Sequence, residues 1–329
     1  MTQRLLCACA VIAMLVPAWA GEVTVLDQAG RTVTVPVPPS RVASAFGVAT
    51  AYLYALGAGD LVVGARYLGI PDSPLTRGVM ARIDPAWADK AFPGDVTAET
   101  VVALRADLVV GGLRHHKLAA LLADVGIPSV LYAAETFDAV RDAIALTGKV
   151  LGREEKAREL AAFFDEVLAQ VGPVATPAGP RVLCVGTHPL RVAAAGMYQS
   201  QLVALAGGKP ASDLPGTAWQ DVNPEQILLW DPEVIVIAPY GTARPESFLA
   251  DPVFAGLSAV RTGRVYKMPQ LLFAWDNPIP ESVLGVVWLA ELLHPGRLPG
   301  ALEAYAVRFY REFYGVELGP EELAGIIGP

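Results

Sequence analysis

One segment near the middle of the chain, residues 154–171, most constrains how this sequence can fold. Its apolar side chains recur at the three- and four-residue spacing of a single helix face. These positions are Ala157, Leu160, Ala161, Phe164, Val167, Leu168 and Val171. Gly152 lies just before the segment and Gly172 just after it, so the predicted helix is bounded on both sides. At 1.5 Å per residue it is roughly 27 Å long, about the width of a small domain.

The segments on the two sides of this helix resemble each other. Residues 96–110, VTAETVVALRADLVV, and residues 222–236, VNPEQILLWDPEVIV, each indicate a short helix, a break and an apolar strand. Glu99 and Glu225 occupy the fourth position of these segments. A second similarity precedes each of them in the same order. We interpret the chain as two similar α/β lobes joined by one helix, with the general likeness of α/β sequences as the alternative.

The order of the predicted elements favours parallel sheets. Strands and helices alternate on both sides of the central helix, which is typical of Rossmann-like lobes with parallel strands. We expect a signal peptide at 1–20, an N-terminal lobe at 21–152, the bridging helix at 153–172 and a C-terminal lobe at 173–329. The proline-containing residues 66–95 are expected to form a long loop. Ligands of such sheets lie beyond the carboxyl ends of the strands, so the two lobes should face each other across a cleft.

The first twenty residues have the features of an export signal. Arg4 precedes an apolar run from Leu5 to Val16, and Ala18-Trp19-Ala20 provides a small-residue cleavage site. Cleavage after Ala20 places the mature protein in a periplasm. A net charge of −8 without a basic cluster argues against a nucleic-acid partner.

The sequence contains no signature of a catalytic site. GxSxG, P-loop and HExxH motifs are absent, and the predicted mature chain keeps one cysteine, Cys184, in an apolar strand. His115 and His116 are adjacent, so their rings point in different directions and do not readily share a metal. A structural role is the first interpretation of these histidines, and contact with a ligand is the second. We therefore expect neither catalytic residues, nor a bound metal, nor a cofactor.

Four segments together carry a resemblance to a known family. They are the export signal, VLDQAGRTVTVPVPPSRV at 25–42, VTAETVVALRADLVVGG at 96–112 and TAWQDVNPEQILLWDPEVIVI at 217–237. The chain resembles the helical-backbone class (class III) of substrate-binding proteins of ABC importers, whose members bind iron–siderophores, haem and cobalamin. The resemblance implies two Rossmann-like lobes, one bridging helix and modest closure. It also implies a monomer that docks on a membrane permease through one glutamate per lobe, here Glu99 and Glu225.

The resemblance also suggests ligand-binding residues. The family's aromatic position before the second-lobe glutamate falls on Trp219, and the loop after the first-lobe strand falls on residues 113–116. The complete set of candidates is Tyr67, Arg114, His115, His116, Trp219, Tyr240, Trp275 and Asp276. Aromatic rings suit large apolar chelates, although each of these rings could instead belong to a core. An anionic chelate would also need Arg66, Arg114 or Arg244, and no dense basic cluster is visible in the sequence.

Three functions remain open from the sequence. The first is a periplasmic binding protein that delivers a metal chelate, an iron–siderophore or a corrinoid, to an ABC permease. The second is a binding protein for molybdate or tungstate, because LGVVWLAELLHP at 284–295 and FYREFYGVEL at 309–318 resemble members for which such an oxyanion is an alternative ligand. The third, an exported enzyme on a similar two-lobed fold, is disfavoured by the missing catalytic signature.

Overall fold

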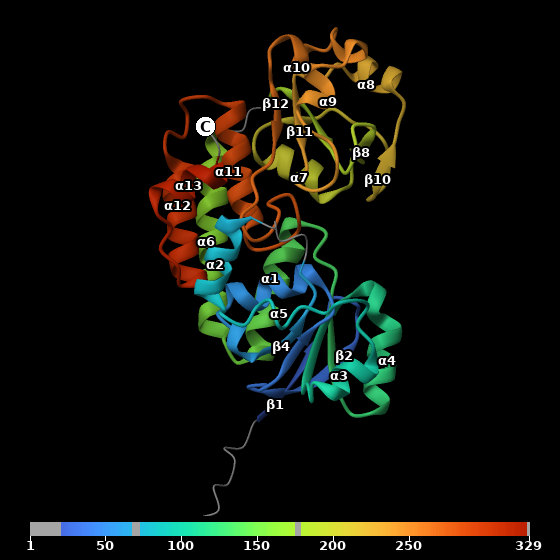
Figure 1. Ribbon diagram of the computed structural model, residues 1–329, viewed down its shortest axis with the longest axis vertical. Coiled ribbons are helices and arrows are strands. Elements are labelled where there is room, and N and C mark those ends of the chain that lie inside the picture. Colours follow the sequence, from blue (N-terminus) through green and yellow to red (C-terminus); the bar gives the residue numbers. More distant parts are fainter. Residues whose placement is uncertain (1–20, 68–72, 175–178, 328–329) are drawn as a thin grey trace, which may run out of the picture.

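The first lobe is a parallel sheet covered by helices, preceded by a β-hairpin (Figure 1). The computed structural model describes residues 21–67, 73–174 and 179–327, so the predicted signal peptide lies outside the described residues. The hairpin consists of β1 (Gly21–Leu26) and β2 (Thr32–Val37). The sheet has the order β4-β3-β5-β6, formed by β3 (Val42–Ser44), β4 (Val62–Ala65), β5 (Leu108–Gly112) and β6 (Ser129–Tyr132). Its helices are α1 (Gly47–Ala55), α2 (Pro74–Ile83), α3 (Ala98–Ala103), α4 (His116–Asp124) and α5 (Phe137–Leu151).

The second lobe contains a mixed sheet of order β10-β8-β7-β11-β12, with β9 also paired to β7. Its strands are β7 (Arg181–Val185), β8 (Arg191–Ala193), β9 (Lys209–Pro210), β10 (Trp219–Asp221), β11 (Val234–Ile237) and β12 (Val265–Lys267). Its helices are α7 (Tyr198–Leu205), α8 (Pro224–Trp230), α9 (Glu246–Leu249) and α10 (Ser258–Arg261). The predicted parallel pairing is found among β7, β9, β11 and β12, whereas β8 runs antiparallel to both of its neighbours, β7 and β10. The turn between β7 and β8 is too short for the crossover that a parallel neighbour requires.

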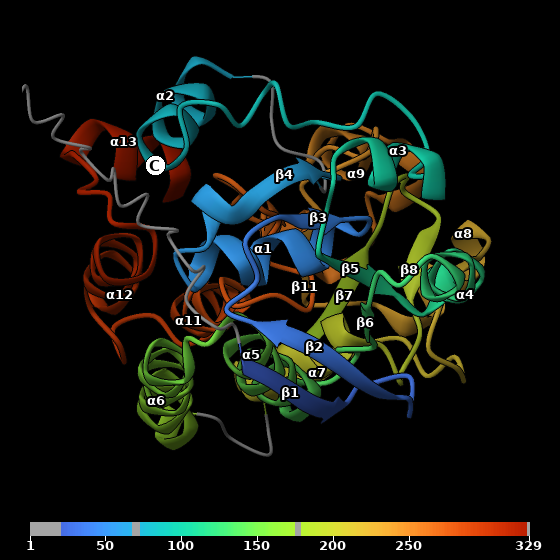
Figure 2. The same cartoon turned by 90° about the horizontal axis from the view of Figure 1, so that it is seen from below.

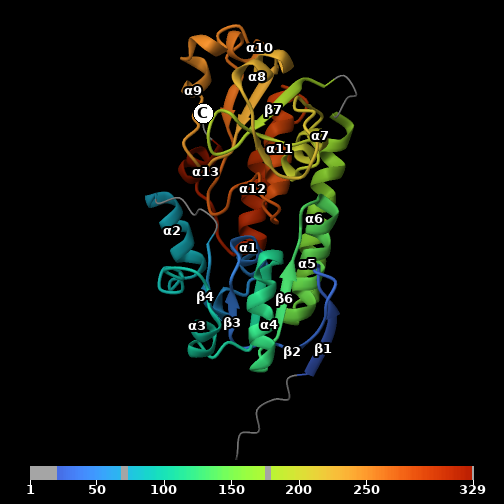
Figure 3. The ribbon, with the colours of Figure 1, turned by 90° about the vertical axis from the view of Figure 1, so that its right-hand side faces the viewer.

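The predicted bridging helix is confirmed as α6 (Glu154–Val171). Figure 3 shows it running beside both lobes, and α11 (Ser282–Leu293) packs against it. The two remaining helices near the end of the chain are α12 (Ala301–Phe309) and α13 (Pro320–Ile327). Most of the predicted stripe of α6 is buried, and Phe163 is buried as well. The extra burial arises because Phe163 packs edge-on against Tyr305, Phe309 and Phe313 from the C-terminal helices.

Aromatic side chains join the two lobes beside α6. Phe137 of the first lobe stacks on Tyr198 of the second, with ring centroids 4.4 Å apart. The hydroxyl of Tyr52 donates a hydrogen bond to the carbonyl of Pro278 at 2.9 Å. Both tyrosines belong to one core cluster that continues through both lobes. The lobes therefore share a packed junction on the α6 side in addition to the covalent connection.

The segment expected to be a long loop, residues 66–95, contains helix α2, so that expectation is wrong. The side chain of Ser73 caps this helix by accepting a hydrogen bond from the backbone N–H of Thr76. Pro74 occupies the first turn, where a missing N–H costs nothing and the fixed φ suits the helix. The proline that suggested a loop is thus part of a helix start.

A carboxyl group is buried at the start of α11. Glu281 is fully buried and accepts a hydrogen bond from the hydroxyl of Tyr310. Burial raises the pKa of Glu281 from 4.5 to about 8, although the Tyr310 hydrogen bond opposes the shift. The folded protein therefore holds a proton at neutral pH that the unfolded chain releases.

This buried proton predicts how stability depends on pH. Because the folded pKa of Glu281 is raised, the free energy of unfolding should fall as pH rises from 4.5 through about 8. The expected slope for one proton is about 1.4 kcal/mol per pH unit. Chemical denaturation between about pH 6.5 and 7.5 should approach this slope in the wild type and give a flatter profile in Glu281→Gln, whose amide cannot ionise. Equal slopes for the two proteins would contradict the assignment.

Candidate functional site

The first lobe has a polar hollow beyond the carboxyl ends of its strands. The hollow has a volume of about 450 Å³. It is lined by Ala45, Arg66, Asp95, Val96, Arg114 and His115. Arg66 follows β4, whereas Arg114 and His115 form the turn after β5. The parallel sheet therefore brings together two guanidinium groups that are distant in the sequence.

The electrostatics of this hollow favour an anion. Arg66 is half-buried and donates one hydrogen bond to the carbonyl of Gly94 at 3.0 Å. The guanidinium of Arg114 lies over the ring of Phe46, 5.3 Å from its centroid. Each guanidinium has further N–H donors in a planar fork that suits oxyanions. Although the sequence showed no dense basic cluster, the fold brings both guanidinium groups to one hollow, where the carboxylate of Asp95 offsets part of their charge.

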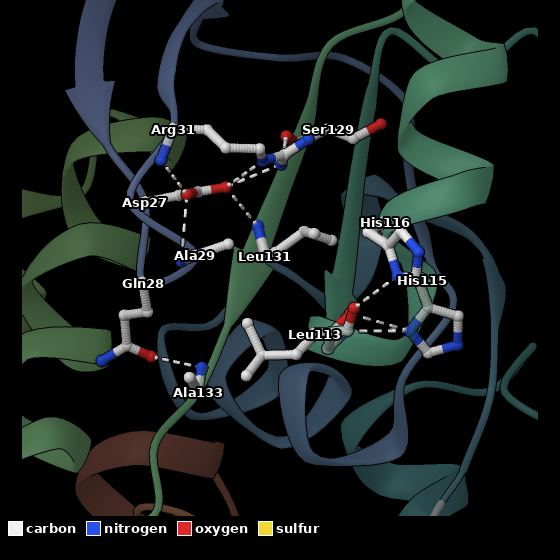
Figure 4. A network of polar contacts seen from close by, with 11 residues as sticks. Asp27, Gln28, Ala29, Arg31, Leu113, His115, His116, Ser129, Leu131 and Ala133 are labelled. Atoms are coloured by element: carbon white, nitrogen blue, oxygen red, sulfur yellow. Dashed lines mark hydrogen bonds and ion pairs between the residues drawn. The ribbon is translucent and has the colours of Figure 1, made fainter.

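The two adjacent histidines differ in their positions. His115 lines the hollow, and its Nδ1 accepts a hydrogen bond from the backbone N–H of Gly112 at 3.0 Å. Burial lowers the pKa of His115, the charge of Arg114 lowers it further, and the Gly112 carbonyl and Asp95 oppose the shift. His116 is exposed and its Nδ1 lies 3.3 Å from the carbonyl of Leu113. Figure 4 shows both rings at this turn, and only His115 is among the residues that line the hollow.

The second lobe has a smaller and largely apolar cavity at the corresponding edge of its sheet. Its volume is about 10 Å³, room for a single water-sized group. It is lined by Cys184, Val185, Gln199, Leu202, Trp219, Val236, Ala238, Met268 and Asp276. The half-buried Trp219 packs on Gly186, where an added Cβ would lie 2.9 Å from the indole ring. A glycine directly after β7 therefore allows the indole to cover the cavity.

Asp276 and Gln199 form the polar part of this cavity, and Tyr240 is hydrogen-bonded to Asp276. Asp276 is 3% exposed, and the hydroxyl of Tyr240 donates to its Oδ2 at 2.7 Å. The side-chain amide of Gln199 donates to the backbone carbonyl of Asp276 at 3.0 Å. Burial raises the pKa of Asp276 to about 6, although hydrogen bonds to its carboxylate from Tyr240, from the Gln199 side chain and from a backbone N–H lower it. Burial and the neighbouring carboxylate also raise the pKa of Tyr240.

Two of the predicted ligand contacts lie elsewhere. Trp275 is 0% exposed and belongs to the core, where its backbone carbonyl faces Gly285 of α11, so the expectation of an accessible indole is wrong. Tyr67 is half-buried, and its hydroxyl contacts the hydroxyl of Tyr54 at 2.9 Å and donates to the Trp87 carbonyl at 3.1 Å. Tyr67 therefore supports the packing of the first lobe and does not line either cavity.

The sequence suggested a ligand role for Arg244 that its hydrogen bonds do not support, and it did not indicate several residues that line the second-lobe cavity. The guanidinium of Arg244 donates to the carbonyls of Gly241 and Ala243, so it braces its own loop. Conversely, Cys184, Gln199 and Met268 line the second-lobe cavity and were not predicted. For Cys184 and Met268, the one feature of the sequence that could have indicated a place in the cavity lining is their position near the carboxyl ends of predicted strands.

The two glutamates of the repeated segments occupy matching places. Glu99 and Glu225 are both exposed in the first turn of α3 and α8. Thr97 and Asn223 cap these helices by accepting hydrogen bonds from backbone N–H groups. The pKa of Glu99 is lowered by a backbone hydrogen bond and by Thr97. Seen from below, α3 and α8 lie on the same side of the molecule, away from α6 and α12 (Figure 2).

Comparison with known proteins identifies the family. The chain matches the periplasmic binding protein family over residues 42–272 and therefore belongs to it. It is 27% identical to the molybdate-binding protein MolA of Haemophilus influenzae, over 98% of this chain and 99% of that protein. It is also 27% identical to the vitamin B12-binding protein of Pectobacterium carotovorum, over 60% of this chain and 71% of that protein.

Solved structures confirm the two-lobed fold. A periplasmic solute-binding protein of Veillonella parvula superposes with a TM-score of 0.79 at 24% identity, covering 93% of this chain and 97% of that one. The molybdate-bound structure of MolA superposes with a TM-score of 0.75 at 24% identity, covering 90% and 99%. The family match confirms the predicted family, and these superpositions agree with its fold of two lobes and one bridging helix. The chain is a substrate-binding protein of the kind that serves ABC importers.

The described residues contain neither a candidate membrane-spanning helix nor a candidate metal-binding group of side chains. None of the helices in the described ranges is both long and apolar enough to cross a membrane. Within the same residues, no three His, Cys, Asp or Glu side chains are grouped so that they could hold a metal ion.

Proposed function

We propose that this periplasmic binding protein carries a small oxyanion of the molybdate–tungstate class to an ABC import permease. The observation that carries the proposal is the basic hollow of the first lobe. Arg66 and Arg114 contribute two guanidinium forks, and His115 adds a third nitrogen-bearing side chain. Charge-assisted hydrogen bonds from arginine are well suited to a compact oxyanion with several acceptor oxygens. The similarity to a molybdate-binding protein over nearly the whole chain supports the same ligand class.

A metal chelate is the second candidate, as the sequence first suggested. The partly exposed indole of Trp219 offers apolar surface to a ligand with an organic shell, although the cavity that it covers admits only a water-sized group. The vitamin B12-binding relative agrees with this ligand class, although the alignment covers a smaller part of the chain. An anionic chelate would use both halves of the cleft, because the first lobe provides charge and the second provides apolar surface.

Calorimetric titration of the purified mature protein with defined compounds tests the proposal. We expect saturable binding of molybdate and tungstate, and no binding of cyanocobalamin or a ferric hydroxamate. Sulfate serves as the control oxyanion, because it tests whether the hollow selects its ligand by size. Binding of cobalamin or the ferric chelate without binding of either metal oxyanion would overturn the proposal in favour of the second candidate.

Replacement of Trp219 distinguishes the two ligand classes. If the ligand is a bulky chelate, Trp219→Ala should weaken binding by about 2 kcal/mol, roughly thirtyfold, because a buried aromatic contact is lost. If the ligand is a small oxyanion held by the first lobe, affinity should change by less than about threefold. Trp219→Phe keeps a ring against Gly186 and is the matched control. Calorimetric titration with the same compounds measures the ligand affinity of both variants.

We further propose that Glu99 and Glu225 dock the protein on the permease. They are exposed, occupy equivalent helices, and lie one in each lobe, as a partner with two similar subunits requires. In this proposal the mature protein begins at Gly21, works in the periplasm as a monomer, and has no catalytic activity. Its lobes comprise residues 21–152 and 173–329, with residues 153–172 as the bridge.

A further inference from the structure

Phe46 supports one of the two arginines of the first-lobe hollow from outside the hollow. The guanidinium carbon of Arg114 lies over its ring, 5.3 Å from the ring centroid. Phe46 itself is not among the residues that line the hollow. The guanidinium also lies near His115, but the 3.4 Å between Nε and the ring Nε2 is beyond the usual range of a hydrogen bond. The aromatic ring is therefore the stronger of these two restraints on Arg114.

The fold fixes the position of the Phe46 ring. Phe46 is the N-cap residue of α1, and its carbonyl accepts hydrogen bonds from the backbone N–H of Thr50 at 3.0 Å and from the hydroxyl of Ser44 at 3.1 Å. Both of these polar residues are fully buried. The ring lies against Gly112 at the end of β5, where an added Cβ would be 2.8 Å from it. The start of α1 and the end of β5 therefore hold the ring between them.

An aromatic ring is a suitable partner for a guanidinium that binds an anion. The ring attracts the cation through its quadrupole, yet it brings no negative charge and leaves the N–H donors free. A carboxylate in the same place would offset the charge and occupy those donors. Arg114 is exposed and has a long side chain, so an anion that recruited it from many rotamers would lose affinity. Holding the guanidinium in place in advance avoids this loss.

We propose that Phe46 is a positioning residue of the anion site, which holds the guanidinium of Arg114 at the hollow before the ligand enters. The inference rests on the proposed function, because it takes the hollow as the site of the oxyanion. Phe46 acts through Arg114 and does not contact the ligand. The side chain of Arg66 is oriented differently, by its hydrogen bond to the carbonyl of Gly94. The two arginines should therefore respond differently to a change at position 46.

Replacing Phe46 by an aliphatic residue tests this role. Phe46→Leu keeps an apolar side chain but removes the aromatic face, so calorimetric titration should show molybdate affinity about fivefold lower, as expected when one long side chain must be ordered on binding. Phe46→Met is a second variant without a ring, whose flexible side chain can fill the same space, and it should lose affinity to the same extent. Phe46→Tyr retains the ring and should bind molybdate like the wild type.

Double-mutant cycles show whether Phe46 acts through Arg114. In the Arg114→Gln background, Phe46→Leu should cause little further loss, because the guanidinium that the ring positions is already absent. In the Arg66→Gln background, Phe46→Leu should still cause the full loss. A ring that served only the packing of the lobe, or that contacted the ligand itself, would lower affinity equally in both backgrounds. That result would overturn the inference, as would unchanged affinity in Phe46→Leu and Phe46→Met.

Failure of the proposed function would give a different result. If the wild-type protein bound neither molybdate nor tungstate, the proposed function would be overturned, and the inference with it. If the wild type bound molybdate but the cycle with Arg114→Gln were additive, the oxyanion function would stand and only the role of Phe46 would be excluded.

Discussion

Replacing both Glu99 and Glu225 by alanine is expected to abolish most ligand uptake while leaving folding and ligand affinity nearly unchanged. Both carboxylates are exposed, and neither residue lines either cavity. Exposed charges of this kind determine registry and association rate more than they determine fold stability. Uptake in cells that express the cognate permease, together with thermal unfolding and titration of the purified variant, measures the three quantities separately. Raised salt should weaken the wild-type complex with the permease.

The matched control removes two exposed carboxylates elsewhere. Glu22→Ala with Glu303→Ala changes the net charge equally, on β1 and in the first turn of α12. This control should retain full uptake. Full uptake by the Glu99 and Glu225 double variant, or loss of its ligand affinity, would show that the docking assignment is wrong.

The neighbours of these glutamates support an interface at the same places. Val102 and Leu228 lie three residues after Glu99 and Glu225, on the same helix face, and are 48% and 39% exposed. The preceding residue of each helix, Val101 or Ile227, is fully buried. The same pair of an exposed acid and an exposed aliphatic side chain therefore recurs in both lobes, which agrees with the proposed docking role of these helices.

Local patterns explain which parts of the fold could be predicted. Helix α6 could be predicted because its apolar periodicity and its bounding glycines are contained within one segment. The antiparallel direction of β8 could not, because the apolar run of a short strand does not specify which neighbour it pairs with. Helix α2 was missed because Pro74 can begin a helix as readily as it can occupy a loop.

The residues of the candidate site were harder to predict from the sequence, because burial and proximity depend on the folded chain. Trp275 was predicted to be accessible from its place before a proline-rich turn, whereas packing against α11 buries it completely. Arg66 and Arg114 were considered only as single charges, since nothing between them in the sequence indicates that they share a hollow. Their proximity follows from the neighbouring positions of strand ends in a folded sheet, which single-sequence patterns do not encode.

That shared hollow leads to the second prediction, that Arg66→Gln combined with Arg114→Gln should lower molybdate affinity by at least about a hundredfold. Each charged hydrogen bond contributes roughly 1.5–3 kcal/mol, and about 1.4 kcal/mol corresponds to a tenfold change. Arg66→Lys keeps the charge but not the planar fork, so it should lie between the wild type and Arg66→Gln. Calorimetric titration at low and at physiological salt measures the affinities.

The control for this variant removes two exposed arginines far from the hollow. Arg158 on α6 and Arg261 on α10 are exposed, so Arg158→Gln with Arg261→Gln changes the net charge equally without touching either cavity. If the hollow binds the oxyanion directly, only the Arg66 and Arg114 variant loses affinity. An equal loss in both variants would instead indicate that the net charge of the protein attracts the ligand. Retained affinity in the Arg66 and Arg114 variant would exclude the first-lobe hollow as the anion site, because the dianion would then lack its two closest positive partners.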